Sequence, residues 1–268
     1  MIYITGMKTK RFTPVFAFLF LILFAGNSLA QEVKREFYEL KTYTIKNEAQ
    51  EKAVDAYLEN AYLPALKRMG IENIGVFKIR PGKFVTADKI FVLIPFNSLD
   101  QFQKMEASLA VDKSHLSAGS DYIMAKHDNP PYQRISSTLM RAFSEMPKME
   151  PSSVSSPRTD RVYELRSYES ATEARYINKV AMFNEGGEVE LFDSVGANAV
   201  FYAEVISGDH MPNLMYMTTY ENMEKRDAVW KAFFGSEKWQ ELVNDERYKN
   251  NVSKADIWLL YPTEYSDY

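Results

Sequence analysis

Two strings of alternating residues carry the side chains best suited to chemistry. They occupy every second position of two β-rich segments: Glu39, Lys41 and Tyr43 in the first, and Glu164, Arg166 and Tyr168 in the second. Side chains two residues apart project from the same face of a strand, about 7 Å from each other, so each carboxylate is placed near a cation. Such a set could bind a small anionic compound: the cation would hold its charge, the carboxylate would transfer or orient a proton, and the phenol would donate a hydrogen bond.

Two further side chains belong to the same hypothesis. Arg226 and Trp230 are four residues apart in a segment with helical periodicity, so they share a helix face. Arg226 could anchor an anion beside the indole of Trp230. Alternatively, Trp230 packs against the sheet and Arg226 pairs with a strand carboxylate such as Glu164. The residues alone leave both interpretations open.

The charged strand faces also have two explanations. Charges on a covered sheet face are costly unless they are paired. Their recurrence indicates either an ion-pair layer that fixes the register of the strands or a polar pocket closed by Tyr43 and Tyr168. Leu40 and Leu165 lie on the opposite faces, which we assign to a covering layer of helices. The charged faces are then expected to look between two sheets.

The remaining residue types exclude several kinds of site. The chain has no cysteine, which excludes disulfides, thiolate catalysis and cysteine-ligated zinc or iron–sulfur centres. Its three histidines lie far apart, without a metal-ligand spacing. We therefore expect no metal and no cofactor. His115 and His127 are expected at the solvated surface, and His210 in a turn, where it is either exposed or a general base.

The amino-acid composition limits the kinds of partner that we expect for this protein. Of the 268 residues, 46% are hydrophobic and 25% are charged, which is ordinary for a globular protein, and the formal charge is −4. Without a basic excess, nucleic acid is not an expected partner. Acidic residues gather around Gly186-Gly187, where they could hold a cation or form a solvated acidic face: Glu185, Glu188, Glu190 and Asp193.

The sequence repeats itself at an offset of about 125 residues. The Tyr-Glu-Leu-basic-small-Tyr string that begins at Tyr38 recurs at Tyr163. Three further blocks recur at nearly the same offset: Met69-Gly70 as Val195-Gly196, 73–77 as 198–202, and Phe96 as Tyr220. Three prolines and four serines in 146–157 are typical of a linker. The pattern predicts two domains, 31–145 and 160–268, joined by a linker at 146–159.

Each copy has the periodicities of a βαββαβ unit. The predicted strands are 37–45, 71–80, 89–96 and 133–143 in the first copy, and 161–168, 198–206, 213–220 and 252–261 in the second. The predicted helices are 48–69 and one from 98 onward, then 172–194 and 221–244. Pro64 and Gly186-Gly187 are expected to interrupt a helix. The fold class is therefore α+β, with two tandem ferredoxin-like repeats packed sheet to sheet as an intrachain α/β barrel.

The first thirty residues have the layout of a secretory signal peptide. Lys8, Lys10 and Arg11 precede an apolar run at 15–25, and small residues before position 31 predict cleavage after Ala30. The run would rise only about 16 Å as a helix, less than the roughly 30 Å bilayer core. We expect an exported protein, periplasmic or secreted, with no stable membrane span after cleavage. Cleavage removes these three basic residues and no acidic one, which changes the formal charge from −4 to −7.

The chain resembles the NIPSNAP family over nearly all of its predicted mature length. The matching segments are 37–40 and 131–143 in the first copy, and 162–169, 182–185, 211–217, 225–233 and 260–266 in the second. The resemblance implies a dimeric α/β-barrel fold and brings no settled biochemical activity. Phe102 stands where the second copy has Arg226, so the second copy is the better place to look for a site.

Two functions are compatible with these observations. The first is binding, with transformation left open, of a small organic or anionic compound in a polar pocket between the two sheets. The alternative is a non-catalytic exported interaction module with a structural ion-pair core. A homo-oligomer is compatible with both. An open polar pocket would favour the first function, and a dry core between the sheets with every charge paired would favour the second.

Overall fold

Eight antiparallel strands close into a barrel in the computed structural model, which describes residues 1–3, 6, 33–82 and 88–268. The predicted signal peptide, residues 1–30, lies almost entirely outside these described residues. Residues 33–268 form one compact unit. No helix in the described part of the chain is long and apolar enough to cross a bilayer.

The first repeat follows the predicted βαββαβ order. Its elements are β1 (Phe37–Thr44), α1 (Glu48–Tyr57), a π-helical turn (Leu58–Tyr62), α2 (Leu63–Arg68), β2 (Gly75–Ile79), β3 (Lys89–Phe96), α3 (Leu99–Leu109), α4 (Lys113–Ala118), α5 (Ser120–Ile123) and β4 (Arg134–Ala142). The π-helical turn lies just before Pro64, which has no backbone N–H to continue the helical ladder. The helical backbone nevertheless continues without a break from Glu48 to Arg68, so the expected interruption takes the form of a π-helical turn.

The second repeat has the same order. Its elements are β5 (Val162–Glu169), α6 (Glu173–Asn184), α7 (Glu188–Ser194), β6 (Asn198–Ser207), β7 (Asn213–Tyr220), α8 (Met223–Gly235), α9 (Glu237–Asn244), a 3₁₀ turn (Glu246–Tyr248) and β8 (Lys254–Pro262). Gly187 separates α6 from α7 with φ 82°, a left-handed conformation that glycine adopts without strain. Ser236 accepts a hydrogen bond from the N–H of Trp239 and so caps α9.

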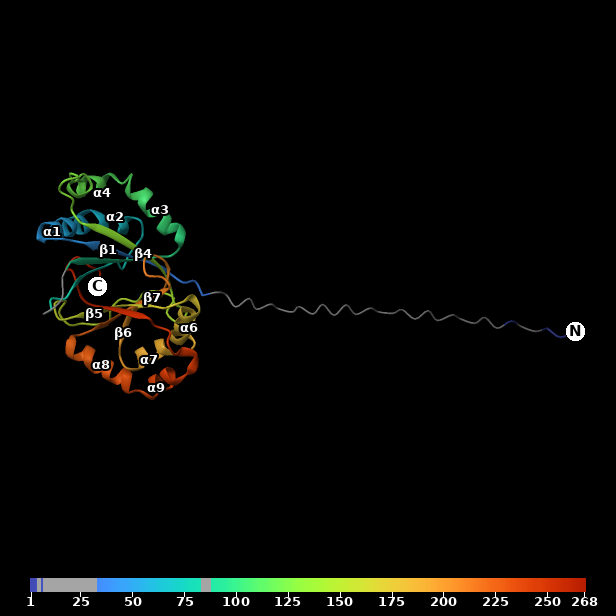
Figure 1. Ribbon diagram of the computed structural model, residues 1–268. Coiled ribbons are helices and arrows are strands. Elements are labelled where there is room, and N and C mark those ends of the chain that lie inside the picture. The colour runs from blue at the N-terminus through green and yellow to red at the C-terminus, as the bar shows by residue number, and fades with distance from the viewer. Residues whose placement is uncertain (4–5, 7–32, 83–87) are drawn as a thin grey trace. The chain divides into compact units, whose positions relative to one another are not determined.

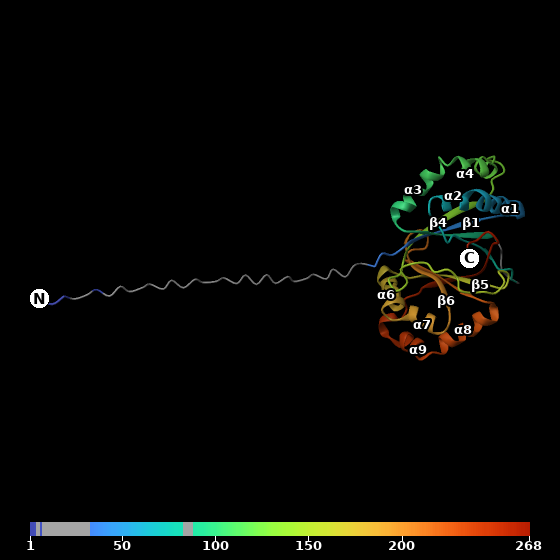
Figure 2. The ribbon, with the colours of Figure 1, turned by 180° about the vertical axis from the view of Figure 1, so that it is seen from behind.

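The strand order around the barrel is β1-β3-β2-β8-β5-β7-β6-β4. Each repeat contributes four neighbouring strands, and the two sheets are joined at the β2–β8 and β4–β6 pairs. The helices of the first repeat cover one side of the barrel and those of the second repeat cover the opposite side (Figure 1). The rear view shows the same arrangement, with the barrel between the helices of the two repeats (Figure 2). The predicted fold of two ferredoxin-like repeats in one barrel is confirmed.

The assignment of the strand faces was wrong. Apolar and aromatic side chains of both sheets fill the barrel interior, among them Tyr38, Leu40, Tyr163 and Leu165. The charged faces lie instead beneath the helices of their own repeat, where Glu164 contacts Arg226 of α8. Both faces of β5 are covered in this architecture, and at Glu164 the helix side supplies the polar partners that a buried charge needs. The predicted polar pocket between the two sheets is therefore replaced by an apolar core.

One further segment differs from expectation. Between α3 and β4 the chain forms two further short helices, α4 and α5, which the periodicity of the sequence did not predict. Asp112 caps α4 by accepting hydrogen bonds from the N–H groups of Ser114 and His115. His115 was expected at the surface, but it is only 5% exposed and its Nε2 lies 3.0 Å from the hydroxyl of Tyr57. His210 does lie in an exposed turn, with a side chain 64% exposed.

Candidate functional site

The predicted residues of the second repeat meet around one buried carboxylate. Glu164 is fully buried on β5. Its Oε2 accepts hydrogen bonds from Arg226 Nε at 2.7 Å and Trp230 Nε1 at 2.9 Å. Its Oε1 accepts from Arg166 Nε at 2.7 Å and Arg226 Nη2 at 3.0 Å. Four hydrogen bonds thus satisfy the carboxylate, and the pairing of Arg226 with Glu164 is one of the two interpretations left open by the sequence.

The rest of this network extends along the same strand face. Arg166 Nη1 donates to the hydroxyl of Tyr168 at 2.8 Å, and its guanidinium lies 3.7 Å from the ring centre of Trp230. Burial alone would raise the pKa of Glu164, but hydrogen bonds from Arg226 and Trp230 and the charge of Arg166 hold it below its ordinary value. Both arginines are therefore committed to protein partners.

A second buried ion pair lies nearby and was not anticipated. Lys179 of α6 donates to Glu188 Oε2 of α7 at 2.7 Å, and both residues are buried. Burial raises the pKa of Glu188, against the opposing effect of the Lys179 charge. Glu188 was expected in an acidic group, but no pattern in the sequence linked it to Lys179, which lies across the Gly186-Gly187 turn. The pair ties α6 to α7.

The first repeat builds a weaker version of the same cluster. Lys41 Nζ donates to the hydroxyl of Tyr62 at 2.9 Å and to Glu106 at 3.4 Å, and it lies 3.9 Å from Glu39. Ser137 donates to Glu39 Oε1 at 2.7 Å, whereas Oε2 has no partner among the described residues. Phe102, at the position of Arg226, packs edge-on against Phe96 and supplies no hydrogen-bond donor. Both repeats therefore place a carboxylate and a cation on the same strand face, but the first repeat lacks the helix arginine that pairs with the carboxylate in the second.

The eight predicted residues are thus brought together in two groups of side chains. Glu164, Arg166, Tyr168, Arg226 and Trp230 form one group, and Glu39, Lys41 and Tyr43 lie in the other, each group between a sheet and its own helices. Their contact with a ligand stays a prediction. Arg226 also borders a mainly apolar cavity of about 460 Å³ together with Met223 and Trp258.

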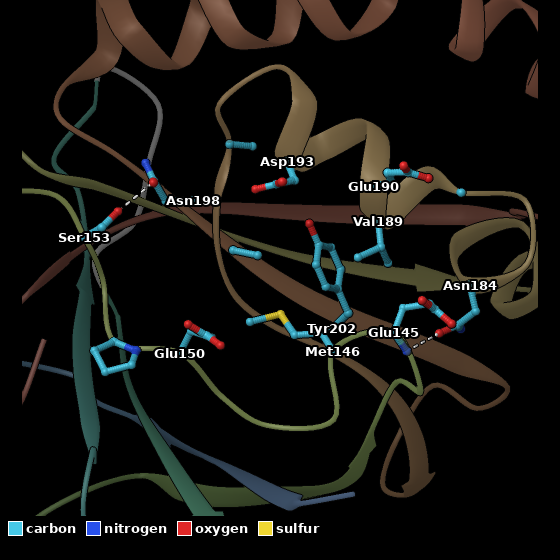
Figure 3. A pocket seen from close by; sticks show the side chains of 14 residues that line it. Glu145, Met146, Glu150, Ser153, Asn184, Val189, Glu190, Asp193, Asn198 and Tyr202 are labelled. Carbon is cyan, nitrogen blue, oxygen red and sulfur yellow. Dashed lines mark hydrogen bonds between the residues drawn. The ribbon is translucent and has the colours of Figure 1, made fainter. Parts of the chain in front are cut away.

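A larger cavity, which the sequence did not predict, lies between α7 and the segment that joins the two repeats. This connecting segment comprises residues 143–161, between β4 and β5. The volume of the cavity is about 640 Å³, within the usual range for small-molecule sites. Glu190 and Asp193 of α7 form one wall, and Glu145 and Glu150 of the connecting segment form the other (Figure 3). No lysine or arginine is among the described residues that line it. At the rim, Lys238 lies beside Gly187 and 3.9 Å from Glu241.

Hydrogen bonds hold the connecting segment in place against the second repeat. Asn184 Oδ1 accepts from Ser144 Oγ at 3.0 Å and from the N–H of Glu145 at 3.2 Å. Ser153 donates to Asn198 Oδ1 at 2.7 Å, and the N–H of Glu150 donates to the carbonyl of Val200 at 3.1 Å. The two acidic walls are therefore fixed relative to each other.

Tyr202 forms the floor of the cavity. It is 1% exposed, and its ring packs among Phe143, Phe192 and Tyr216. Its hydroxyl points toward Asp193 in Figure 3 and has no hydrogen-bond partner in the described part of the chain. Burial raises the pKa of Tyr202 well above its ordinary value, so the group stays a neutral phenol. The hydroxyls of Tyr38, Tyr163 and Tyr268 also lack a partner among the described residues, but that of Tyr202 differs because its residue lines the cavity, where a bound molecule or water would satisfy it.

Comparison with known proteins identifies relatives of both repeats. The NIPSNAP family model matches residues 38–144 and 163–267. No curated protein matches the chain. A candidate monooxygenase from Lactobacillus acidophilus is 9% identical and superposes with a TM-score of 0.55, covering 85% of this chain and 94% of its own. A second, from Fusobacterium nucleatum, is 6% identical with a TM-score of 0.53, covering 86% and 93%.

Another similar protein matches less than half of this chain. A NIPSNAP family protein of unknown function from Agrobacterium tumefaciens is 16% identical with a TM-score of 0.35, covering 40% of this chain and 93% of its own. The two candidate monooxygenases share the whole barrel fold with this chain, and at such low identity the likeness concerns the fold alone.

Proposed function

The chain belongs to the NIPSNAP family, and we propose that this member binds a small organic cation in the acidic cavity between α7 and the connecting segment. The observation that carries the proposal is the meeting of four carboxylates and one buried, unpartnered phenol in a single cavity. Carboxylates attract cations and repel anions, and a concave wall strengthens this effect. The expectation of an anionic ligand held by Arg166 and Arg226 has less support, because Glu164, Tyr168 and Asp227 already bind their guanidinium groups.

The likeness to candidate monooxygenases supports small-molecule binding only in a general way. Those proteins share the barrel and are described as candidate monooxygenases. We propose binding alone, since the cavity itself contains no histidine, lysine or cysteine that could act as a nucleophile or a base near neutral pH.

We also propose that the protein acts after export. The support is the arrangement of basic residues, apolar run and small residues before Gln31. Intact-mass analysis of the chain recovered from a cell envelope fraction would give a protein that begins at Gln31. Full-length chain recovered only from the cytosol would contradict export.

The binding proposal is tested by calorimetric titration with putrescine as a cationic probe and succinate as an anionic one. We expect putrescine alone to bind. Replacing two wall carboxylates, in the variant Glu190→Gln/Asp193→Asn, should weaken its binding about tenfold, which corresponds to roughly 1.4 kcal/mol. Exposed ion pairs of this kind contribute up to about 1 kcal/mol each.

The matched control is Glu224→Gln/Glu237→Gln. It removes the same number of exposed charges from α8 and α9, outside the residues that line the cavity, and leaves the Lys238–Glu241 contact at the rim intact. Its affinity for putrescine should equal that of the unaltered protein. Equal weakening in both variants would mean that only net charge matters, and absence of any binding would leave the interaction-module alternative as the better account.

A further inference from the structure

Resting on the proposed function, we infer that the ligand is an aliphatic diamine or polyamine whose ammonium groups reach both acidic walls at once. The juxtaposition that carries this inference is four carboxylates spread around one cavity, with apolar side chains on the floor between them.

The placement of the carboxylates argues against a metal ion. A cation such as Ca²⁺ takes six to eight oxygen ligands at about 2.3–2.6 Å, so its carboxylates must converge on one point. In residues 33–82 and 88–268, no three acidic or histidine side chains are close enough together to hold a metal. The four carboxylates instead lie apart around the cavity: Glu190 and Asp193 are on α7, Glu145 lies beside Asn184, and Glu150 lies on the other side of Met146 (Figure 3). Separated carboxylates on the two walls match a ligand that carries positive charges at two separate places.

The floor between the walls suits a hydrocarbon chain. Met146, Val189 and Ala199 line it without polar side-chain atoms. The side chains of Met146 and Val189 lie on either side of Tyr202 in Figure 3. Methylene groups laid on this surface would leave water, which favours binding by about 0.8 kcal/mol for each CH₂ that is fully buried. A ligand that is charged at its ends and apolar between them therefore fits the cavity along its whole width.

The buried phenol selects primary or secondary ammonium groups over quaternary ones. Quaternary ammonium ions are recognised by open aromatic faces. The ring of Tyr202 is enclosed by other aromatic side chains and its hydroxyl oxygen is itself buried, so the residue offers no open aromatic face to a quaternary ammonium ion. An N–H group would donate to that hydroxyl oxygen, which has no partner of its own among the described residues. A choline-like cation has no N–H to offer.

The test compares spermidine and putrescine with n-butylamine and choline by calorimetric titration of the full protein. Butylamine matches the four-carbon chain of putrescine but carries one charge. We expect putrescine and spermidine to bind at least tenfold more tightly than butylamine or choline. Removing a carboxylate from the connecting-segment wall, in Glu150→Gln, should weaken spermidine at least fivefold and leave butylamine within twofold.

Tyr202→Phe gives an independent check of the same inference. It removes a hydroxyl that bonds to no described residue and keeps the ring, so the fold should be unaffected. Spermidine affinity should fall about fivefold, while the melting temperature stays unchanged or rises. An unchanged affinity would remove Tyr202 from the site.

The outcomes separate the two proposals. If butylamine binds as tightly as the diamines and Glu190→Gln/Asp193→Asn still weakens it, the cavity binds cations but the polyamine class is wrong. If no amine responds to the cavity variants, the proposed function itself fails. Screening by 0.5 M NaCl should weaken spermidine more than butylamine, because more charges are paired.

Discussion

Replacing Glu164 with glutamine is expected to remove about 3–5 kcal/mol from the free energy of unfolding. The carboxylate is fully buried and accepts four hydrogen bonds from Arg166, Arg226 and Trp230. Without its charge, two guanidinium groups would remain in the layer between sheet and helix, and loss of one partner of a buried ion pair carries a cost of this size. Denaturation in urea, followed by circular dichroism, measures the change.

The control for this substitution is Glu237→Gln on α9. Its exposed side chain should contribute less than about 0.5 kcal/mol. A loss below about 1 kcal/mol for Glu164→Gln would show that solvent or another side chain compensates the arginines, and the cluster would then not be a structural ion pair.

Acid should remove the same contribution in the unaltered protein. The pKa of Glu164 lies below its ordinary value in the folded state, so its stabilising effect is complete above the ordinary value of 4.5. The effect is lost as the pH falls through the lowered pKa. The difference in stability between the unaltered protein and Glu164→Gln should therefore shrink at low pH.

Breaking the Lys179–Glu188 pair is expected to cost a similar amount, about 3–5 kcal/mol, in the variant Lys179→Met. Glu188 is 2% exposed, and without Lys179 it would be a buried carboxylate with no ammonium partner at 2.7 Å. The double variant Lys179→Met/Glu188→Leu removes both charges and should recover most of the loss. Urea denaturation of the two variants and the unaltered protein provides the measurement.

The two ion pairs should differ in their response to pH. Burial raises the pKa of Glu188, so its contribution is most favourable below its ordinary value of 4.5 and is lost as the pH rises through the raised pKa. Lys179→Met should strengthen this trend, with a larger loss at pH 8 than at pH 5. If the double variant is no more stable than the single one, repulsion or poor packing explains the loss, and the ion pair does not.

Much of the fold could be predicted because the repeat constrains it. The Tyr-Glu-Leu string at Tyr38 and Tyr163 fixed the offset between the copies, and the βαββαβ order then implied two similar sheets. Alternation along β5 showed that Glu164, Arg166 and Tyr168 share a face. It could not show which face looks inward, because both faces of a barrel strand are covered when helices pack outside.

The signal that would have corrected the face assignment was present in the helix. Arg226 and Trp230, four residues apart, offer N–H donors on one helix face, and a buried carboxylate needs such donors. Their proposed partner Glu164 had therefore to point toward α8. The apolar partners on the other face, Tyr163 and Leu165, could then fill the barrel.

The acidic cavity could not be predicted, because its walls come from separate parts of the chain. Glu190 and Asp193 were recognised as part of an acidic group. The prolines and serines near Glu150 predicted a linker. The sequence around them does not reveal that Ser153 forms a hydrogen bond with Asn198. The unpartnered hydroxyl of Tyr202 depends on packing from four aromatic neighbours, which only the folded chain defines.

A crystal structure of the protein with spermidine tests most directly whether the acidic cavity is the ligand site. The predicted result is one spermidine molecule across the cavity, with ammonium groups beside Asp193 and Glu150 and one N–H within about 3.2 Å of the hydroxyl oxygen of Tyr202. Spermidine bound elsewhere on the protein, or ordered water alone bonded to Tyr202 at saturating spermidine, would contradict this account.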